Sequence, residues 1–261
     1  MVTKEELDPL WHKALELHQA GQLSDAEVLY RRMLDAEPRM PPVWYHLAVC
    51  QHEQGRPIDA VASLDEALKL KPDLIEALRT KSEILLHSGA TAQAVPALEQ
   101  WVMIAPGDAD ASLLYGWALM SLGRNAEALQ VLDRLLAIHP GNSQALTNRG
   151  TVLRLLNRHE ESLVSLNEAL ALRPGDASTL NMRGATLAML GRKDEAMRDM
   201  DKAIAANPNF ANAHYNRAGL LAELGRSEEA ARAYDQVLEI DPGFQDAQSR
   251  RDMLRTGGKP N

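Results

Sequence analysis

Large apolar residues recur at three- and four-residue steps through most of the chain, the spacing that places side chains on one face of an α-helix. Leu132, Leu135, Leu136 and Ile138 illustrate this spacing. No run of alternating apolar and polar residues competes with it. The pattern therefore predicts a chain of α-helices without a sheet.

The helical pattern is punctuated at a fixed interval. A proline recurs at an unbroken spacing of 34 residues, at Pro38, Pro72, Pro106, Pro140, Pro174, Pro208 and Pro242. A residue that tolerates a left-handed backbone stands 17 positions before each proline, at Gly21, Gly55, Gly89, Gly123, Asn157, Gly191 and Gly225. Because proline closes a helix and a left-handed residue makes a tight turn, each interval is expected to hold two helices.

Two further columns contain only small residues. One lies in the first helix of each interval, at Ala14, Ala48, Ser82, Gly116, Gly150, Gly184 and Ala218. The other lies in the second, at Ala26, Ala60, Ala94, Ala128, Ser162, Ala196 and Ala230. Small side chains let neighbouring helix axes approach closely, whereas a leucine would force them apart. The columns predict helix pairs that are stable only when stacked on their neighbours.

We expect one domain over residues 1–261, composed of seven helix pairs and a cap. The predicted repeats cover residues 7–40, 41–74, 75–108, 109–142, 143–176, 177–210 and 211–244. Polar residues such as Gln248 and Asp252 indicate a solvating capping helix over 245–256, before a flexible tail at 257–261. The first full helix is expected to begin at Asp8 and Pro9, and the spacing of Thr3 and Glu6 offers an earlier start.

Two local features add to this picture. Pro96 falls inside the second helix of the third repeat, where its missing N–H predicts a shifted or kinked helix near 92–97 and an apolar pocket around Leu86, Trp117 and Met120. Ser24 and Glu27 have the spacing of a capping box, in which each side chain bonds to the other residue's backbone N–H.

The chain resembles the tetratricopeptide repeat family in its small residue, turn glycine, alanine, large apolar residue and closing proline in each 34-residue unit. The resemblance covers about residues 7–244. It implies an all-α fold, a right-handed superhelical solenoid of seven helix-turn-helix units plus a C-terminal capping helix. It also implies a role in binding proteins or peptides.

Two recognition patterns of this family bear on the sequence. The positions in line with the carboxylate clamp of chaperone-binding members hold Tyr45, Val49, Arg79 and Glu83, so that clamp is not assembled. The resemblance to the repeat arrays of protein O-glycosyltransferases, which grip a peptide backbone with a ladder of asparagines, is partial. Asn148 and Asn216 occupy the matching place, and the ladder is interrupted by Met182, Leu114, Thr80, His46 and His12.

The first helices of such an array are expected to line a concave groove. Residues offset from the packing columns supply the candidates for partner binding: Trp11, Tyr45, Arg79, Leu86, Trp117, Met120, Asn148, Arg154, Asn181, Asn212, Tyr215 and Asn216. Aromatic, arginine and methionine side chains, which are enriched among binding hot spots, gather in the first four units. Trp11, Tyr45 and Trp117 are the expected apolar anchors, and the alternative is that they fill space between helices.

Two other sets of residues have structural interpretations. His46 stands four residues before Cys50, a spacing that can place two metal ligands on one helical face. The cysteine column is apolar in other repeats, so we expect a packed cysteine and no metal. Arginines at a 34-residue interval lie beside acidic or amide residues of the second helices, and an ion-pair ladder between neighbours is expected there rather than an anion site: Arg149, Arg183 and Arg217 with Asp133, Asn167, Asp201 and Asp235.

Composition excludes several classes of function. The net charge of -8 and the lack of a basic stripe argue against a nucleic-acid partner. No apolar run approaches the roughly 20 residues of a membrane span, and acidic residues near the N-terminus take the place of a signal-peptide core, so we expect a cytoplasmic protein without a membrane partner. A single cysteine cannot form an internal disulfide.

No phosphate loop, nucleophile elbow or catalytic cluster is evident, which predicts neither an enzyme nor a cofactor. The sequence therefore favours a protein-protein interaction scaffold that binds a peptide or helical segment in its concave groove. The alternative is the substrate-selecting or regulatory arm of a larger enzyme such as a glycosyltransferase.

Overall fold

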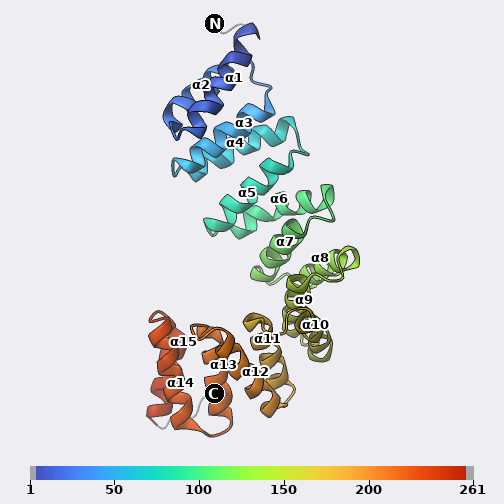
Figure 1. Cartoon of the computed structure of the whole chain (residues 1–261), viewed down its shortest axis with the longest axis vertical. Coiled ribbons are helices and arrows are strands. Elements are labelled where there is room, and N and C mark those ends of the chain that lie inside the picture. The colour runs from blue at the N-terminus through green and yellow to red at the C-terminus, as the bar shows by residue number, and fades with distance from the viewer. Residues whose placement is uncertain (1–3, 257–261) are drawn as a thin grey trace. The chain divides into compact units, whose positions relative to one another are not determined.

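The computed structural model describes residues 4–256, which form fifteen α-helices and no β-strand (Figure 1). The helices are α1 (Lys4–Gln19), α2 (Leu23–Ala36), α3 (Pro41–Glu53), α4 (Pro57–Leu70), α5 (Ile75–His87), α6 (Thr91–Ile104), α7 (Ala109–Ser121), α8 (Asn125–Ile138), α9 (Ser143–Leu155), α10 (His159–Leu172), α11 (Ala177–Met189), α12 (Lys193–Ala206), α13 (Ala211–Glu223), α14 (Ser227–Ile240) and α15 (Gln245–Arg255). The predicted all-α array of helix pairs is confirmed. The tail at 257–261 lies outside the described residues.

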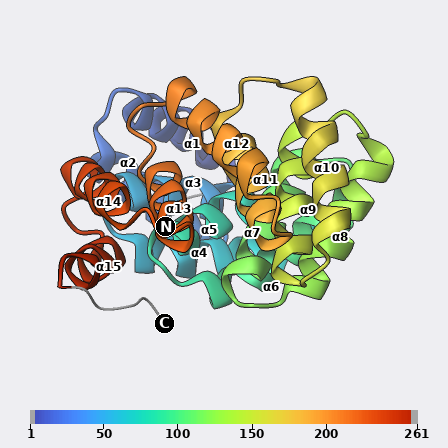
Figure 2. The same ribbon diagram turned by 90° about the horizontal axis from the view of Figure 1, so that it is seen from below.

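The chain divides into two compact units, which we call the N-terminal unit (Met1–Arg124, with α1–α7) and the C-terminal unit (Asn125–Asn261, with α8–α15). The boundary lies between the two helices of the fourth predicted repeat. Within each unit consecutive helices pack against one another, as α3 does against α4 in one and α14 against α15 in the other (Figure 2).

The turns between paired helices have the predicted left-handed residue. The six glycines of the column have φ between 72° and 75°, and Asn157 has φ 58°. At the turn after α3, the amide of Gly55 donates to His52 O at 2.9 Å and the amide of Arg56 donates to Gln51 O at 2.9 Å. These two bonds satisfy carbonyls that the end of the helix leaves free, and they fix the direction in which the second helix departs.

The small columns are buried as predicted, and the tightest contact is at Gly150. A Cβ built on Gly150 would lie 2.6 Å from Cγ of the buried Leu166. No real Cβ tolerates so short a contact, so α9 and α10 approach each other more closely than an alanine permits. At Gly184 a Cβ would lie 3.1 Å from both Ala196 O and Met200 Cγ, a less severe restriction.

Two predictions of helix geometry are wrong. Pro96 does not break or shift its helix, because α6 runs over Thr91–Ile104 with the same 14 residues as the other second helices. Pro96 and Ala92 are exposed, so water can bond to the carbonyl that the proline leaves without a donor. The first helix does not start at Asp8, since α1 begins at Lys4 and contains Pro9. This boundary agrees with the earlier start that the spacing of Thr3 and Glu6 offered.

The prediction of a capping box at Ser24 and Glu27 is also wrong. Helix α2 begins at Leu23, and its cap residue, Gln22, makes no side-chain capping bond. Glu27 instead binds two arginines, as described below, so its carboxylate is turned away from the helix start.

Candidate functional site

In each unit the first helices of neighbouring repeats touch one another and form a shared face. Helix α3 contacts α5 in the N-terminal unit, and α11 contacts both α9 and α13 in the C-terminal unit. We call these surfaces the first-helix faces. They contain the side chains that the repeat phase selects as candidates.

An aromatic cluster occupies the start of the first-helix face in the N-terminal unit. The ring centroids of Trp11 and His46 are 5.0 Å apart and meet edge to face, and His46 stacks on Tyr30 at 6.1 Å. His18 Nδ1 lies 3.2 Å from the Tyr30 hydroxyl, and His18 Nε2 lies 3.1 Å from Glu53 Oε2. The cluster joins α1, α2 and α3 through both packing and hydrogen bonds.

Burial governs the protonation of this cluster. It raises the pKa of Tyr30 to about 12, with Cys50 and Glu53 adding to the effect. It also lowers the pKa of His46, and the neighbouring His18 adds to the shift. Burial thus favours the neutral forms of Tyr30 and His46, which suits an apolar wall.

A largely apolar pocket of about 370 Å³ lies beside this cluster and is called the N-terminal pocket. It is lined by α1, α2, the residue before α3 and the first turn of α3, with Leu7, Asp8, Trp11, Met33, Met40 and Pro42 among its walls. Trp44 Nε1 donates to Pro38 O at 2.8 Å, which ties down the connection that carries Met40. Asp8 is the one acidic residue in the lining, so the walls of the pocket are apolar with one carboxyl group at the edge.

The other candidates of the N-terminal unit differ in exposure. Tyr45 is half-buried against His46, with ring centroids 5.2 Å apart. The exposed Arg79 places its guanidinium 5.3 Å from the ring centroid of the buried Trp101. Leu86 and Met120 are half-buried, whereas Trp117 is 45% exposed. Trp117 is thus the anchor candidate with the most free surface in this unit.

In the C-terminal unit a pocket of about 220 Å³, called the C-terminal pocket, is built from three successive first helices. Its lining includes Arg154 of α9, Ala185 of α11, Tyr215, Asn216 and Gly219 of α13, and Arg250 of α15. Tyr215 is held between Tyr234 and Phe244, at centroid distances of 5.6 Å and 4.9 Å. The candidates Arg154, Tyr215 and Asn216 are therefore brought together.

The remaining asparagines do not form a continuous ladder. Asn216 Nδ2 donates to Asn181 Oδ1 at 2.9 Å. Asn181 is fully buried, so it offers no surface to a ligand and acts only by holding Asn216. Asn148 accepts a bond from Gln144 at 3.3 Å, and Asn212 is exposed. Asn216 is the asparagine of this set that is partly exposed and also lines a pocket.

The recurring arginines form the predicted ion-pair ladder. Arg149 Nε and Arg217 Nε each donate at 2.6 Å to an aspartate sixteen residues earlier, Asp133 and Asp201. Arg183 binds Asn167 at 2.9 Å and adds a bidentate pair with Asp199, at 2.6 Å and 2.8 Å. Fixed partners within the array make a structural role the better interpretation of these arginines.

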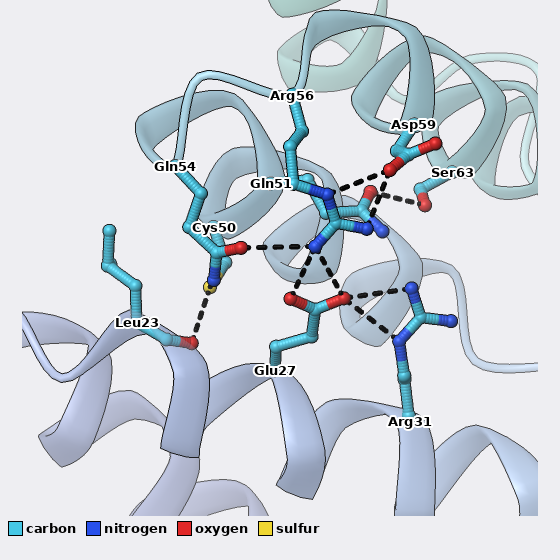
Figure 3. A network of polar contacts seen from close by, with 9 residues as sticks. All are labelled: Leu23, Glu27, Arg31, Cys50, Gln51, Gln54, Arg56, Asp59 and Ser63. Carbon is cyan, nitrogen blue, oxygen red and sulfur yellow. Dashed lines mark hydrogen bonds and ion pairs between the residues drawn. The ribbon is translucent and has the colours of Figure 1, made fainter.

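A polar network around Glu27 was missed by the sequence interpretation (Figure 3). Arg31 and Arg56 both donate to its carboxylate at 2.8 Å, and Arg56 also bonds to Asp59 at 2.6 Å. Burial raises the pKa of Glu27, but the two guanidinium groups outweigh that effect and hold its pKa below the usual value. Arg56 lies 29 residues from Glu27 and is in no helical register with it, so only the packing of α2 against α3 reveals the pair.

The cysteine is part of the same region and is packed as expected. Cys50 is fully buried and its Sγ donates to Leu23 O at 3.0 Å. Burial raises the pKa of the thiol, which disfavours the thiolate that binds metals.

Over residues 4–256, no group of three or more His, Cys, Asp or Glu side chains is arranged to hold a metal ion. None of the helices in that range has the length and apolar character needed to cross a membrane.

Comparison with solved structures places the fold. A tetratricopeptide repeat protein from Parabacteroides merdae is 19% identical, with 96% of this chain and 99% of that chain covered and a TM-score of 0.69. PilW, a type IV pilus biogenesis factor, is 22% identical over 80% of this chain and 97% of its own, with a TM-score of 0.65. YrrB, a TPR protein with an unusual peptide-binding site, is 20% identical over 70% of this chain and 95% of its own, with a TM-score of 0.60.

The family models match the sequence itself. No curated protein matches. Models described as tetratricopeptide repeat match residues 17–84, 85–149, 143–176 and 181–243, well over half of the sequence. The chain belongs to the tetratricopeptide repeat family.

Proposed function

We propose that this chain is a protein-protein interaction scaffold whose first-helix faces hold a segment of a partner protein. The observation that carries the proposal is where the pockets lie. Trp11 in the N-terminal pocket belongs to the positions that the repeat phase assigns to the groove, and so do Arg154, Tyr215 and Asn216 in the C-terminal pocket. Two pockets at the positions expected to face a ligand support binding at these faces.

The size of the pockets favours a peptide segment over a folded surface. Volumes of about 370 Å³ and 220 Å³ each accommodate one or two side chains. Peptides bind such faces by placing separate side chains into separate pockets, with the residues between them making weaker contacts. The N-terminal unit suits apolar side chains, because Trp11 and the exposed Trp117 supply flat apolar surface.

YrrB supports a peptide as the ligand, since it is a protein of this fold with a peptide-binding site. The partner we propose is therefore a protein or peptide, and the groove candidates named from the sequence, except the fully buried Asn181, are the proposed contact residues.

Selection from a displayed library of random peptides with the full chain tests this function. Selected peptides are then titrated against variants by fluorescence anisotropy. We expect about tenfold weaker binding or more on Trp117→Ala or on Gly219→Met, which fills the C-terminal pocket. The control is Ile58→Ala on the second helix α4, where an 84% exposed apolar side chain lies off the first-helix face. Failure to select any peptide, or equal loss with Ile58→Ala, contradicts the proposal.

A further inference from the structure

Arg154 differs from the other partly buried arginines of the C-terminal unit. Arg149 and Arg183 each bind an aspartate. The half-buried Arg154 makes no ion pair with any residue in 4–256, and its Nε is shielded from solvent without a hydrogen-bond partner. Burial lowers the pKa of Arg154, and no neighbouring acid offsets the shift.

Such an arrangement is unfavourable in the free protein. A guanidinium N–H that is removed from water loses its hydrogen bonds to water. Only a hydrogen bond to another acceptor, preferably an anion, compensates for that loss. The helix that carries Arg154 does not supply one. Helix α11 presents the small Ala185 and Ala188 to the pocket, which leaves space beside the arginine instead of a partner.

The other charged groups of the C-terminal pocket are already engaged. Glu223 forms an ion pair with Lys193 at 3.1 Å. The Arg250 guanidinium lies over the ring of Tyr215, 5.7 Å from its centroid. Asn216 is tied to Asn181. Arg154 is therefore the polar group of this pocket that most needs a ligand.

We propose that the C-terminal pocket binds a carboxylate of the partner segment through Arg154. This inference rests on the proposed function, because the carboxylate is carried by a bound peptide. A planar carboxylate matches the fork of a guanidinium in a bidentate pair. The apolar walls at Ala188, Met189 and Leu220 suit a singly charged group on a short apolar stem. With Glu223 also in the lining, a phosphate dianion meets more repulsion than a carboxylate does.

The carboxylate has two sources, an Asp or Glu side chain or the C-terminus of the partner. A selected peptide is therefore made in three forms: unchanged, with its acidic side chains replaced by amides, and with an amidated C-terminus. The form that loses affinity identifies the source. Each form is titrated against the wild-type full chain, Arg154→Met and Arg232→Met. Arg232 is a 69% exposed arginine on α14, so its substitution makes the same change in net charge away from the pocket.

We expect Arg154→Met to weaken binding of the unchanged peptide by about tenfold or more, and Arg232→Met to have little effect. Against Arg154→Met, neutralising the peptide carboxylate is expected to cost nothing further, because the two changes remove the same contact. The carboxylate assignment is overturned if Arg154→Met binds the unchanged peptide as tightly as the wild type does. It is also overturned if the loss of affinity from Arg154→Met adds fully to the loss from neutralising the peptide. In both cases peptide binding itself stands.

The free protein gives a second readout that needs no peptide. Since Arg154 is unpaired, Arg154→Met is expected to raise the midpoint of thermal unfolding by removing a poorly hydrated charge. A lowered midpoint means that Arg154 stabilises the fold and is not held for a ligand.

Discussion

The two units have the same packing columns and different surface chemistry. The N-terminal unit holds all four tryptophans of the chain, and its pocket is walled by tryptophan and methionine. The pocket of the C-terminal unit includes the polar residues Arg154, Asn216 and Arg250 in its lining. Residues that stack the helices are therefore separate from those that face a ligand, and each set varies without disturbing the other.

This difference provides a way to observe the units separately. Tryptophan fluorescence follows the N-terminal unit alone, whereas far-UV circular dichroism follows the helices of both.

Trp101→Ala is expected to have the largest effect. Trp101 is fully buried and its Nε1 donates to Asp108 at 3.1 Å, and the equivalent positions in other repeats hold residues as small as Ala67. We expect a loss of about 3–5 kcal/mol in the free energy of unfolding, measured by urea titration with both signals.

The matched change in the C-terminal unit is Leu135→Ala, in the same column and equally buried. It is expected to lower the transition seen by circular dichroism more than that seen by fluorescence. If it lowers the fluorescence midpoint as much as Trp101→Ala does, the two units unfold as one body, and the comparison between them fails.

Glu27→Gln is expected to destabilise the N-terminal unit by about 1.5–3 kcal/mol at neutral pH, because Arg31 and Arg56 lose a charged acceptor. The folded-state pKa of Glu27 lies below its unfolded value, so its contribution is fully present above the unfolded pKa of about 4.3. It is lost as pH falls through the folded pKa. Urea titrations of both proteins from neutral pH to strongly acidic pH should converge at the acid end, and a constant difference excludes the proposed ion pairs.

Gly150→Ala tests how closely the helices of the C-terminal unit approach. The new methyl group meets Leu166 at 2.6 Å, and overpacking typically costs about 1–3 kcal/mol. Removing a helical glycine returns about 0.5–1 kcal/mol, so the central values of the two effects leave a net loss of about 1 kcal/mol. Circular dichroism should report it, and an unchanged midpoint means that α9 and α10 separate at little cost.

Gly219→Ala is the counterpart and is expected to stabilise the same unit. Its Cβ would meet only the Tyr234 hydroxyl, at 3.7 Å, an ordinary contact. The gain should be about 0.5–1 kcal/mol, from the reduced backbone freedom of the unfolded chain. Together the two variants distinguish a glycine required by packing from one that leaves room in a pocket, and destabilisation by Gly219→Ala contradicts that distinction.

The parts of the fold that were predictable depend on local chemistry or on the repeat itself. A left-handed turn needs glycine or asparagine, so the turn column was readable in every repeat. The pairs between Arg149 and Asp133 and between Arg217 and Asp201 were readable because one spacing serves several repeats. Asp199 falls outside that column, and its bidentate pair with Arg183 was not foreseen.

The features that the sequence did not reveal involve contacts that occur in one place only, or a side chain that has no partner. Pro96 was expected to disrupt α6, but the cost of a missing donor is small where the carbonyl faces water. Glu27 was assigned to a cap because the nearby Ser24 fits that motif, while Arg56, one of its two arginine partners, is distant in sequence. The unpaired state of Arg154 is a property of every neighbour at once, so no spacing predicts it.

The constant phase of turns and ladder also bears on how an array like this changes in length. In the C-terminal unit, Arg217 and Arg251 each find an aspartate sixteen residues earlier, so neighbouring repeats present interchangeable edges. A gene segment that encodes thirty-four residues can be lost or duplicated at a matching point, and the joined repeats still offer one another a small-residue contact. Evolution by recombination can thus add or delete a binding pocket in one step without redesigning an interface.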